Sequence, residues 1–243
     1  MLLKRSIQLY LSNFITALGF ALLLVFVLPL MQLPLTFISS GSIFLNYDFV
    51  DSPSFRSLLL IAVSLLFMFF YSVLISLMVF AVRNDLSRVK LNYYLKEKIQ
   101  KFSFKIFYFY IFLALAAVLL NALMTGIGVP QVAIAAVLFI ITALFSFVPQ
   151  SIVIDETSVN YAIANNLEFI QKKPAQLLAV VVAGILLTLA LVLVEFVLDS
   201  TLLIGNFLSL LVFMVFVIPF LEVMKSKLYM GKFELVKHID QFG

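Results

Sequence analysis

The chain has 243 residues, of which 64% are hydrophobic and 12% are charged, and its mean hydropathy is +1.19. Soluble domains are about half apolar and about a quarter charged, so this composition excludes a soluble globular protein and indicates one that faces lipid. The absence of cysteine excludes disulfides, thiolate metal sites and a cysteine nucleophile, and the net charge of +4 comes from sixteen basic and twelve acidic residues.

Six apolar runs are each long enough to cross a hydrocarbon core of about 30 Å as a helix. The first follows Lys4 and Arg5, as in a signal peptide, but it is too long for one and no cleavage site follows it, so we expect a retained span. Pro29 and Pro34 predict a kink or early unwinding near its outer end. The predicted spans are Phe14–Ile38, Leu58–Val82, Ile106–Met124, Val132–Val148, Ala175–Val197 and Leu202–Leu221.

The basic residues are distributed unequally between the two sides of these spans. Fifteen of the sixteen lie before span one, between spans two and three, between spans four and five, or after span six, and only Arg56 lies opposite. The positive-inside rule therefore predicts a multi-pass protein of the cell membrane with both termini in the cytoplasm. It also makes anionic lipid headgroups on the cytoplasmic face a better partner than nucleic acid. The candidates for lipid contact are Arg88, Lys96, Lys98, Lys101, Lys172 and Lys173.

The outer and inner connections differ in length and pattern. On the outer side, Thr125–Pro130 and Leu198–Thr201 predict tight antiparallel hairpins, and Ser39–Ser57 is the only sizeable segment. The inner connections carry apolar residues at helical spacing among polar ones, with Asp85 and Asp155 placed as N-caps, which predicts amphipathic interfacial helices. The apolar residues are Leu91, Leu95, Ile99 and Phe102 in one connection and Val159, Ile163, Leu167 and Ile170 in the other.

This pattern indicates an internal repeat. Tyr10, Tyr94 and Tyr161 fall at similar places in three segments that each precede a span. We predict an all-α fold, a polytopic membrane bundle of six transmembrane helices that form three hairpin units in one domain, each entered through an amphipathic cytoplasmic helix. The alternative is that these segments are independent connectors, which any polytopic protein can carry. The predicted units are approximately 1–84, 85–152 and 153–243.

Ionisable residues inside spans are the usual functional candidates, since a charge at the centre of the bilayer costs about 2.5–3.5 kcal/mol. Glu195 and Asp199 lie on one face near the outer end of span five, and form either a cation or proton site or, as we favour, two contacts with the outer headgroups. Glu222, three residues before Lys225, is expected to form an interfacial ion pair. Neutral polar residues at depth are expected to hydrogen-bond between helices. They are Asn121, Thr188 and Asn206.

Two prolines are expected to bend helices near the cytoplasmic side. Pro149 and Pro219 each free a backbone carbonyl, and either open a cavity there or redirect the chain into a surface helix. Catalytic signatures are missing, because the only histidine is His238 and no nucleophile elbow, P-loop or zinc-protease motif occurs. We therefore expect no enzyme activity, no metal site and no cofactor.

Two segments carry a recognisable pattern. The first is residues 149–178, PQSIVIDETSVNYAIANNLEFIQKKPAQLL, and the second has Tyr229 ten residues after Pro219. They resemble an uncharacterised superfamily of six-span membrane proteins, which includes the membrane domain fused to some glycerophosphoryl diester phosphodiesterases and stand-alone archaeal and bacterial members. The resemblance implies the six-span fold, but it offers no catalytic residues, and no phosphodiesterase domain is present to imply that activity. The matched positions in the first segment are Pro149, Asp155, Ser158, Ala162, Lys173 and Pro174.

The repeat, the prolines and the missing catalytic groups favour a transporter-like or permease-like bundle for a lipid or a small apolar solute. A solute path should appear as a cavity open to one side and lined by Asn121, Asn206 or Glu195. The alternative is a membrane scaffold or accessory subunit. Its basic cytoplasmic helices would then bind a partner protein, a second copy of the chain in a homo-oligomer, or anionic lipid.

Overall fold

The computed structural model describes residues 2–26, 35–37, 43–45, 55–86, 95–202 and 205–233. In this part of the chain, five helical segments are long and apolar enough to cross a membrane, and a bent helix pair at the start qualifies as a sixth. The fold is thus an all-α polytopic membrane bundle, as predicted. The described strands, β1 (Leu35–Phe37) and β2 (Ile43–Leu45), form one antiparallel hairpin.

The first span is the least regular. It consists of α1 (Leu2–Ser12), α2 (Phe14–Leu18) and a 3₁₀ turn (Gly19–Leu23), and the chain bends by 77° between Leu3–Ser12 and Phe14–Phe26. Because Leu35–Phe37 is a strand, the prediction of one span over Phe14–Ile38 is wrong at its outer end. The sequence predicts early unwinding here from Pro29 and Pro34, but both prolines lie outside the described residues.

The other spans overlap their predicted positions, but the third begins earlier, at Lys98, and the sixth runs on to Met230. One outer turn is confirmed, since only 127–130 separate two helices. The position of the other turn is wrong because Leu198–Thr201 is still helical, although the helices on either side pack together as predicted. The elements are α4 (Phe55–Leu86), α5 (Leu95–Gly126), α6 (Gln131–Leu144), α7 (Val148–Ile154), α8 (Val159–Lys172), α9 (Pro174–Leu202), α10 (Gly205–Val212), a π-helix (Phe213–Val217), α11 (Ile218–Met230) and a 3₁₀ turn (Gly231–Phe233).

The inner segments follow the prediction only in part. The segment between spans four and five forms the separate helix α8, whereas the described part of the earlier segment, from Leu95, is continuous with α5. Both N-cap predictions are wrong. Asp85 lies within the last turn of α4, where it accepts hydrogen bonds from Ser12 Oγ at 3.0 Å and Asn13 Nδ2 at 2.7 Å, and Ser158 is the N-cap of α8.

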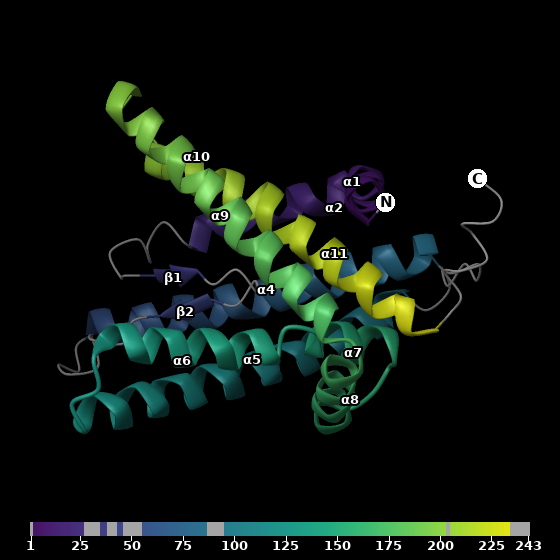
Figure 1. Ribbon diagram of the computed structural model, residues 1–243, viewed down its shortest axis with the longest axis horizontal. Coiled ribbons are helices and arrows are strands. Elements are labelled where there is room, and N and C mark those ends of the chain that lie inside the picture. Colours follow the sequence, from purple (N-terminus) through teal and green to yellow (C-terminus); the bar gives the residue numbers. More distant parts are fainter. Residues whose placement is uncertain are drawn as a thin grey trace.

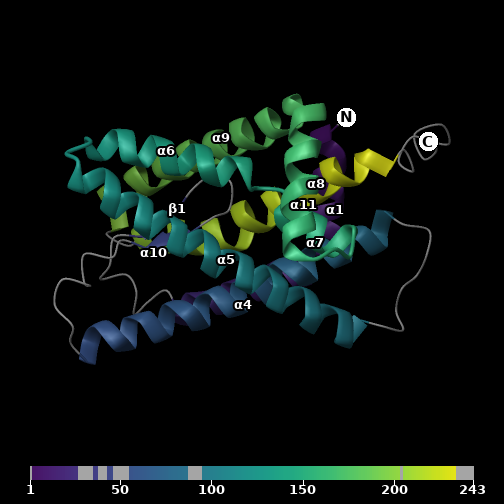
Figure 2. The same cartoon turned by 90° about the horizontal axis from the view of Figure 1, so that it is seen from below.

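The bundle has a central pair of spans and two spans that face outward. In the span that ends at Met230, 67% of the apolar stretch is buried inside the protein, and in α4 50% of it is buried. The corresponding buried shares are 17% in α5 and 11% in α9. The end of α11, the α7–α8 pair and α1 lie together at one end of the molecule, and the α5–α6 turn lies at the other (Figures 1 and 2). We call the first end the basic end, because it carries Lys98, Lys101, Lys172 and Lys173.

Two spans are broken near the basic end, each beside a predicted helix-bending proline. The fourth span breaks between α6 and α7, where Asn166 of α8 accepts from the backbone N–H of Phe147 at 3.1 Å and donates to the carbonyl of Leu144 at 2.7 Å. The sixth span contains the π-helix just before Pro219. Both prolines are buried, so these breaks lie inside the protein, where irregular backbone is tolerated at membrane depth.

Candidate functional site

A charged pair is buried where α4, α7 and α11 pack together. Glu222 and Lys225 are only 0% and 1% exposed, and Lys225 Nζ forms an ion pair with Glu222 Oε1. Gln150 of α7, also 0% exposed, donates from Nε2 to Glu222 Oε2 at 2.8 Å. We call Gln150, Glu222 and Lys225 the buried polar cluster. The predicted ion pair thus forms, and both of its side chains are buried between helices.

Hydroxyl groups accompany this cluster on the same helices. Ser226 donates to the carbonyl of Glu222 at 2.7 Å, and Ser72 of α4 donates to the carbonyl of Met68 at 2.7 Å. By contrast, several buried side-chain oxygens among the described residues have no hydrogen-bond partner, and they include Ser76 Oγ, Ser146 Oγ and Gln150 Oε1. Each unmade bond of a buried polar atom costs about 1–3 kcal/mol. The region therefore has spare hydrogen-bonding capacity, which water or a solute can use.

Two tyrosines, one buried and one half-buried, complete the electrostatic surroundings. Tyr71 of α4 and Tyr110 of α5 both interact electrostatically with the Glu222 carboxylate. Lys225 balances the charge of Glu222, so the cluster is formally neutral while it carries two ionisable groups. Such an arrangement can bind a polar group, or exchange a proton, by rearranging an internal ion pair rather than by importing a net charge.

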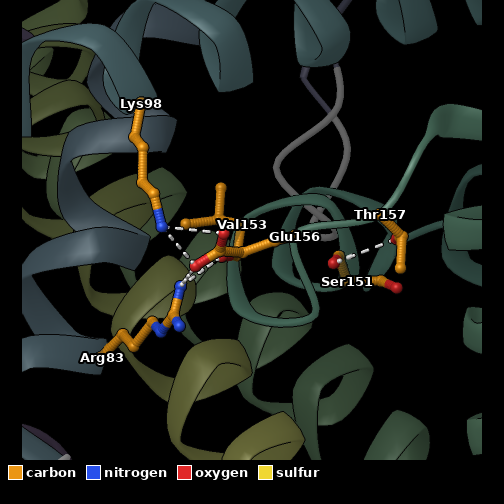
Figure 3. A network of polar contacts seen from close by, with 6 residues as sticks. All are labelled: Arg83, Lys98, Ser151, Val153, Glu156 and Thr157. Carbon is orange, nitrogen blue, oxygen red and sulfur yellow. Dashed lines mark hydrogen bonds and ion pairs between the residues drawn. The ribbon is translucent and has the colours of Figure 1, made fainter. Parts of the chain in front are cut away.

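The turn between α7 and α8 connects this region to the basic end (Figure 3). Arg83 of α4 donates to Glu156 Oε1 at 3.0 Å and to the carbonyl of Val153 at 2.9 Å. Lys98 of α5 donates to both carboxylate oxygens of Glu156 at 2.9 Å. Lys105 of the same helix donates to the carbonyl of Thr157 at 2.7 Å. The turn is thereby fastened to the last turns of α4 and the first turns of α5.

Glu156 is unusual in both its backbone and its charge. Its φ of 56° lies in the left-handed region, which non-glycine residues adopt at a cost. Burial alone would raise the pKa of Glu156, but the hydrogen bonds and charges of Lys98 and Arg83 together lower it below its ordinary value of 4.5. The carboxylate therefore stays ionised and holds the turn at neutral pH.

The neighbouring Asp155 connects the same turn to a different pair of helices. Its Oδ2 accepts from Ser151 Oγ at 3.0 Å, from Asn165 Nδ2 at 3.2 Å and from the hydroxyl of Tyr229, and Lys232 Nζ lies 3.9 Å away. Two consecutive acidic residues thus fasten the α7–α8 turn, one to α4 and α5 and the other to α8 and the end of α11.

The predicted intramembrane candidates lie elsewhere. Glu195 of α9 accepts from Ser209 of α10 at 2.8 Å, so it connects two helices of one hairpin. Thr188, also on α9, has a buried Oγ1 without a hydrogen-bond partner, and Asn121 is half-exposed on α5. The side chains of Asp199 and Asn206 lie outside the described part of the chain. None of the described candidates belongs to the buried polar cluster.

Some of the basic residues predicted to contact lipid are paired with other groups. Lys98 is paired with Glu156, Lys172 with Glu168 one turn earlier, and Lys173 donates to the carbonyl of Gly231 at 3.2 Å. Lys101 is exposed on α5. Arg88 and the side chain of Lys96 lie outside the described residues.

Neither a metal centre nor a relative identifies the chemistry. Within the ranges that the structure describes, no three acidic or histidine side chains are grouped so that they could hold a metal ion. Comparison of the chain with models of protein families, with curated proteins and with solved structures finds no match. The buried polar cluster is therefore the feature from which a function has to be argued.

Sequence reasoning found one part of this cluster and missed the other. The spacing of Glu222 and Lys225 identified the pair, but Gln150 was treated only as part of a segment that follows a bending proline. A polar side chain directly after a proline, in the last turns of a span, is a signal that could have marked it.

Proposed function

We propose that this chain is a non-enzymatic, permease-like protein of the cell membrane, with both termini in the cytoplasm. In this proposal the buried polar cluster lies on the route of a small solute or lipid. The charged pair favours a solute that presents a polar group over one that is wholly apolar. The relationship to the six-span superfamily, suggested by residues 149–178, is part of the same proposal.

The buried polar cluster is the observation that carries this proposal. Ionisable side chains within membrane spans are expensive and commonly mark substrate or proton pathways. A purely structural cluster would be expected to have its own polar atoms satisfied, yet Gln150 Oε1 is buried without a partner. Ser76 Oγ on α4 and Ser146 Oγ, four residues before Gln150, are also unpartnered, as is Thr188 Oγ1 on α9, away from the cluster. A route that is intermittently hydrated supplies the missing hydrogen bonds, and so accounts for these atoms.

The broken spans support the same proposal. Many transporters place their solute sites beside interrupted helices, because freed backbone groups and helix ends provide polar contacts. Here the break between α6 and α7 immediately precedes Gln150, and the π-helix precedes Glu222 by one turn. The broken segments and the ionisable groups therefore belong to the same region of the bundle.

Cysteine accessibility tests the proposal directly, because the natural chain has no cysteine. Ser76→Cys and Ser146→Cys are nearly isosteric changes at two of the unpartnered hydroxyls. Met78→Cys is the matched control, since Met78 is also buried on α4 but faces the opposite side of the helix. In sealed vesicles, we expect a membrane-impermeant thiol reagent to modify the two test cysteines at least about tenfold faster than the control, because only hydrated thiols ionise readily.

Equal reactivity of the test and control cysteines would contradict the proposal. If both test cysteines react no faster than Met78→Cys, the bundle is closed around the cluster and the permease proposal fails. That outcome would favour the membrane scaffold or accessory subunit, in which the cluster only joins helices.

A further inference from the structure

The first turns of α5 carry a concentration of positive charge. Lys98, Lys101 and Lys105 are spaced i, i+3 and i+7, so they share one face of the helix, and Arg83 reaches the same place from the end of α4. Among the side chains that the structure describes here, Glu156 is the acidic partner of this group. Four positive charges against one negative charge leave a local excess of about three.

Lys101 occupies a particular position in this group. Lys98 and Arg83 point to Glu156, and Lys105 donates to the carbonyl of Thr157, whereas Lys101 is exposed. Lys101 lies within the first turn of the candidate span Lys98–Gly126, which is the level at which a spanning helix meets lipid headgroups. An anion beside Lys101 would also lie close to the positive field of the other three groups.

An apolar stripe continues from Lys101 into the membrane. Phe104, Tyr108 and Phe112 follow it at i+3, i+7 and i+11, so they lie on the same face of α5, and their exposures are 50%, 69% and 59%. Leu115 and Leu119 extend the stripe by two more turns and are also exposed. The same face of one helix therefore presents a cation at headgroup level and then five apolar side chains along the hydrocarbon.

We propose that this face of α5 is a binding site for one anionic phospholipid of the cytoplasmic leaflet. The phosphate lies at Lys101, within the field of Lys98, Lys105 and Arg83, and an acyl chain lies along Phe104, Tyr108 and Phe112. Aromatic rings and a lysine at headgroup level are the features that hold a lipid at a helix surface. A free phosphate ion would use the charge but not the stripe, so the combination favours a lipid. This site does not depend on a permease route, but its place in the cytoplasmic leaflet rests on the orientation given in the proposed function.

A comparison of two exposed lysines provides the test. In Lys101→Gln the charge at the proposed site is removed, and in Lys172→Gln a charge is removed from α8, where the lysine is 70% exposed and paired with Glu168. Both variants and the natural full-length chain are purified in neutral detergent. Binding is measured by native mass spectrometry and by the rise in Tm, with phosphatidylglycerol, phosphatidylcholine or inorganic phosphate as the added probe.

The natural chain is expected to bind phosphatidylglycerol in preference to phosphatidylcholine, and inorganic phosphate is expected to produce no comparable rise in Tm. Lys101→Gln should weaken the phosphatidylglycerol affinity about fivefold, as expected for one lysine at an anionic membrane surface, while Lys172→Gln should leave it unchanged. Equal affinity for the two lipids, or equal losses in the two variants, would overturn the proposal. An equal effect of inorganic phosphate would assign the site to a free anion instead.

Discussion

Replacing either Glu222 or Lys225 leaves the other as an unpaired buried charge. Removing one partner of a buried pair typically costs about 3–5 kcal/mol, whereas replacing both by neutral groups costs much less. We therefore expect Lys225→Met and Glu222→Gln to lower the free energy of unfolding by several kcal/mol each, and the double variant to lose less than their sum. Denaturation of the purified variants in detergent measures this double-mutant cycle. Additive losses would show that the two charges do not interact.

The left-handed backbone of Glu156 leads to a second prediction. Replacement by alanine removes the carboxylate and keeps the unfavourable φ of 56°, whereas glycine removes the carboxylate but adopts this φ without penalty. Glu156→Gly should therefore be more stable than Glu156→Ala by about 1 kcal/mol in thermal or chemical denaturation. Glu168 is the control, because it lies in the interior of α8 with ordinary helical backbone, and there glycine should be the less stable replacement. The same order at both positions would contradict the argument.

The carboxylate of Glu156 also links stability to pH. Because the folded chain lowers its pKa below 4.5, Glu156 stabilises the fold above its unfolded-state pKa, and this contribution is lost as the pH falls through the folded-state pKa. The Tm of the natural chain should therefore fall more steeply below pH 4.5 than that of Glu156→Gln. Scanning fluorimetry from neutral to acidic pH measures both profiles, and parallel curves would show that the ion pairs with Lys98 and Arg83 contribute nothing.

The sequence predicted which residues on one helix pair with each other better than it predicted the burial and the more distant partners of those residues. The spacing of Glu222 and Lys225 was enough to predict their ion pair, because both lie on one helix. Their burial depends on α4 and α7, and Gln150 reaches Glu222 from 72 positions away, which no local pattern encodes. Asp85 shows the same limit: it was assigned to the start of the next helix, but its partners, Ser12 and Asn13, lie on the first span.

At the scale of elements, the irregular sixth span is supported by the first helix. Pro219 has no N–H to donate to the carbonyl of Val215, its partner in an α-helix, and the hydroxyl of Tyr10 donates to that carbonyl instead at 3.0 Å. Tyr10→Phe should therefore cost about 1–2 kcal/mol of unfolding free energy. In a Pro219→Ala background the helix can supply its own donor, so the cost should shrink, as measured by denaturation in detergent. An equal cost in both backgrounds would rule out this compensation.

The amphipathic segments show why helix boundaries were harder to predict than helices. The segment before the third span has the same 3.6-residue period as the span itself, so periodicity cannot separate them, and α5 runs on without a break from Leu95. The segment before the fifth span is separated by Lys173 and Pro174, since proline disfavours helix in the residue before it. Tyr10 is buried and Tyr161 is exposed, so these two predicted counterparts have different environments.

At the scale of the molecule, hydropathy predicted which segments cross the membrane but not their order from centre to periphery. The least hydrophobic of the span windows, which ends at Met230, has a mean hydropathy of 2.2 and is the most buried, whereas α9, at 3.1, is the least buried. α5 does not follow this order, since its mean hydropathy is 2.3 and only 17% of it is buried, but the contrast between the two extremes has a physical reason. Spans that face lipid are selected for apolar surface, while a central span can exchange apolar residues for polar ones that contact other helices.

The positive-inside assignment is a statement about the whole molecule, and it can be tested with two labels. Thr125 is exposed at the α5–α6 turn and Asn160 is exposed on α8, and these elements lie at opposite ends of the bundle (Figure 1). Because the natural chain has no cysteine, Thr125→Cys and Asn160→Cys each carry a single thiol, and the unmodified chain is the blank. We expect an impermeant thiol reagent added to intact cells to label Thr125→Cys alone, and to label Asn160→Cys only in inside-out vesicles. The reversed result would invert the topology, and labelling of both from one side would mean that the bundle does not span the membrane as its apolar helices indicate.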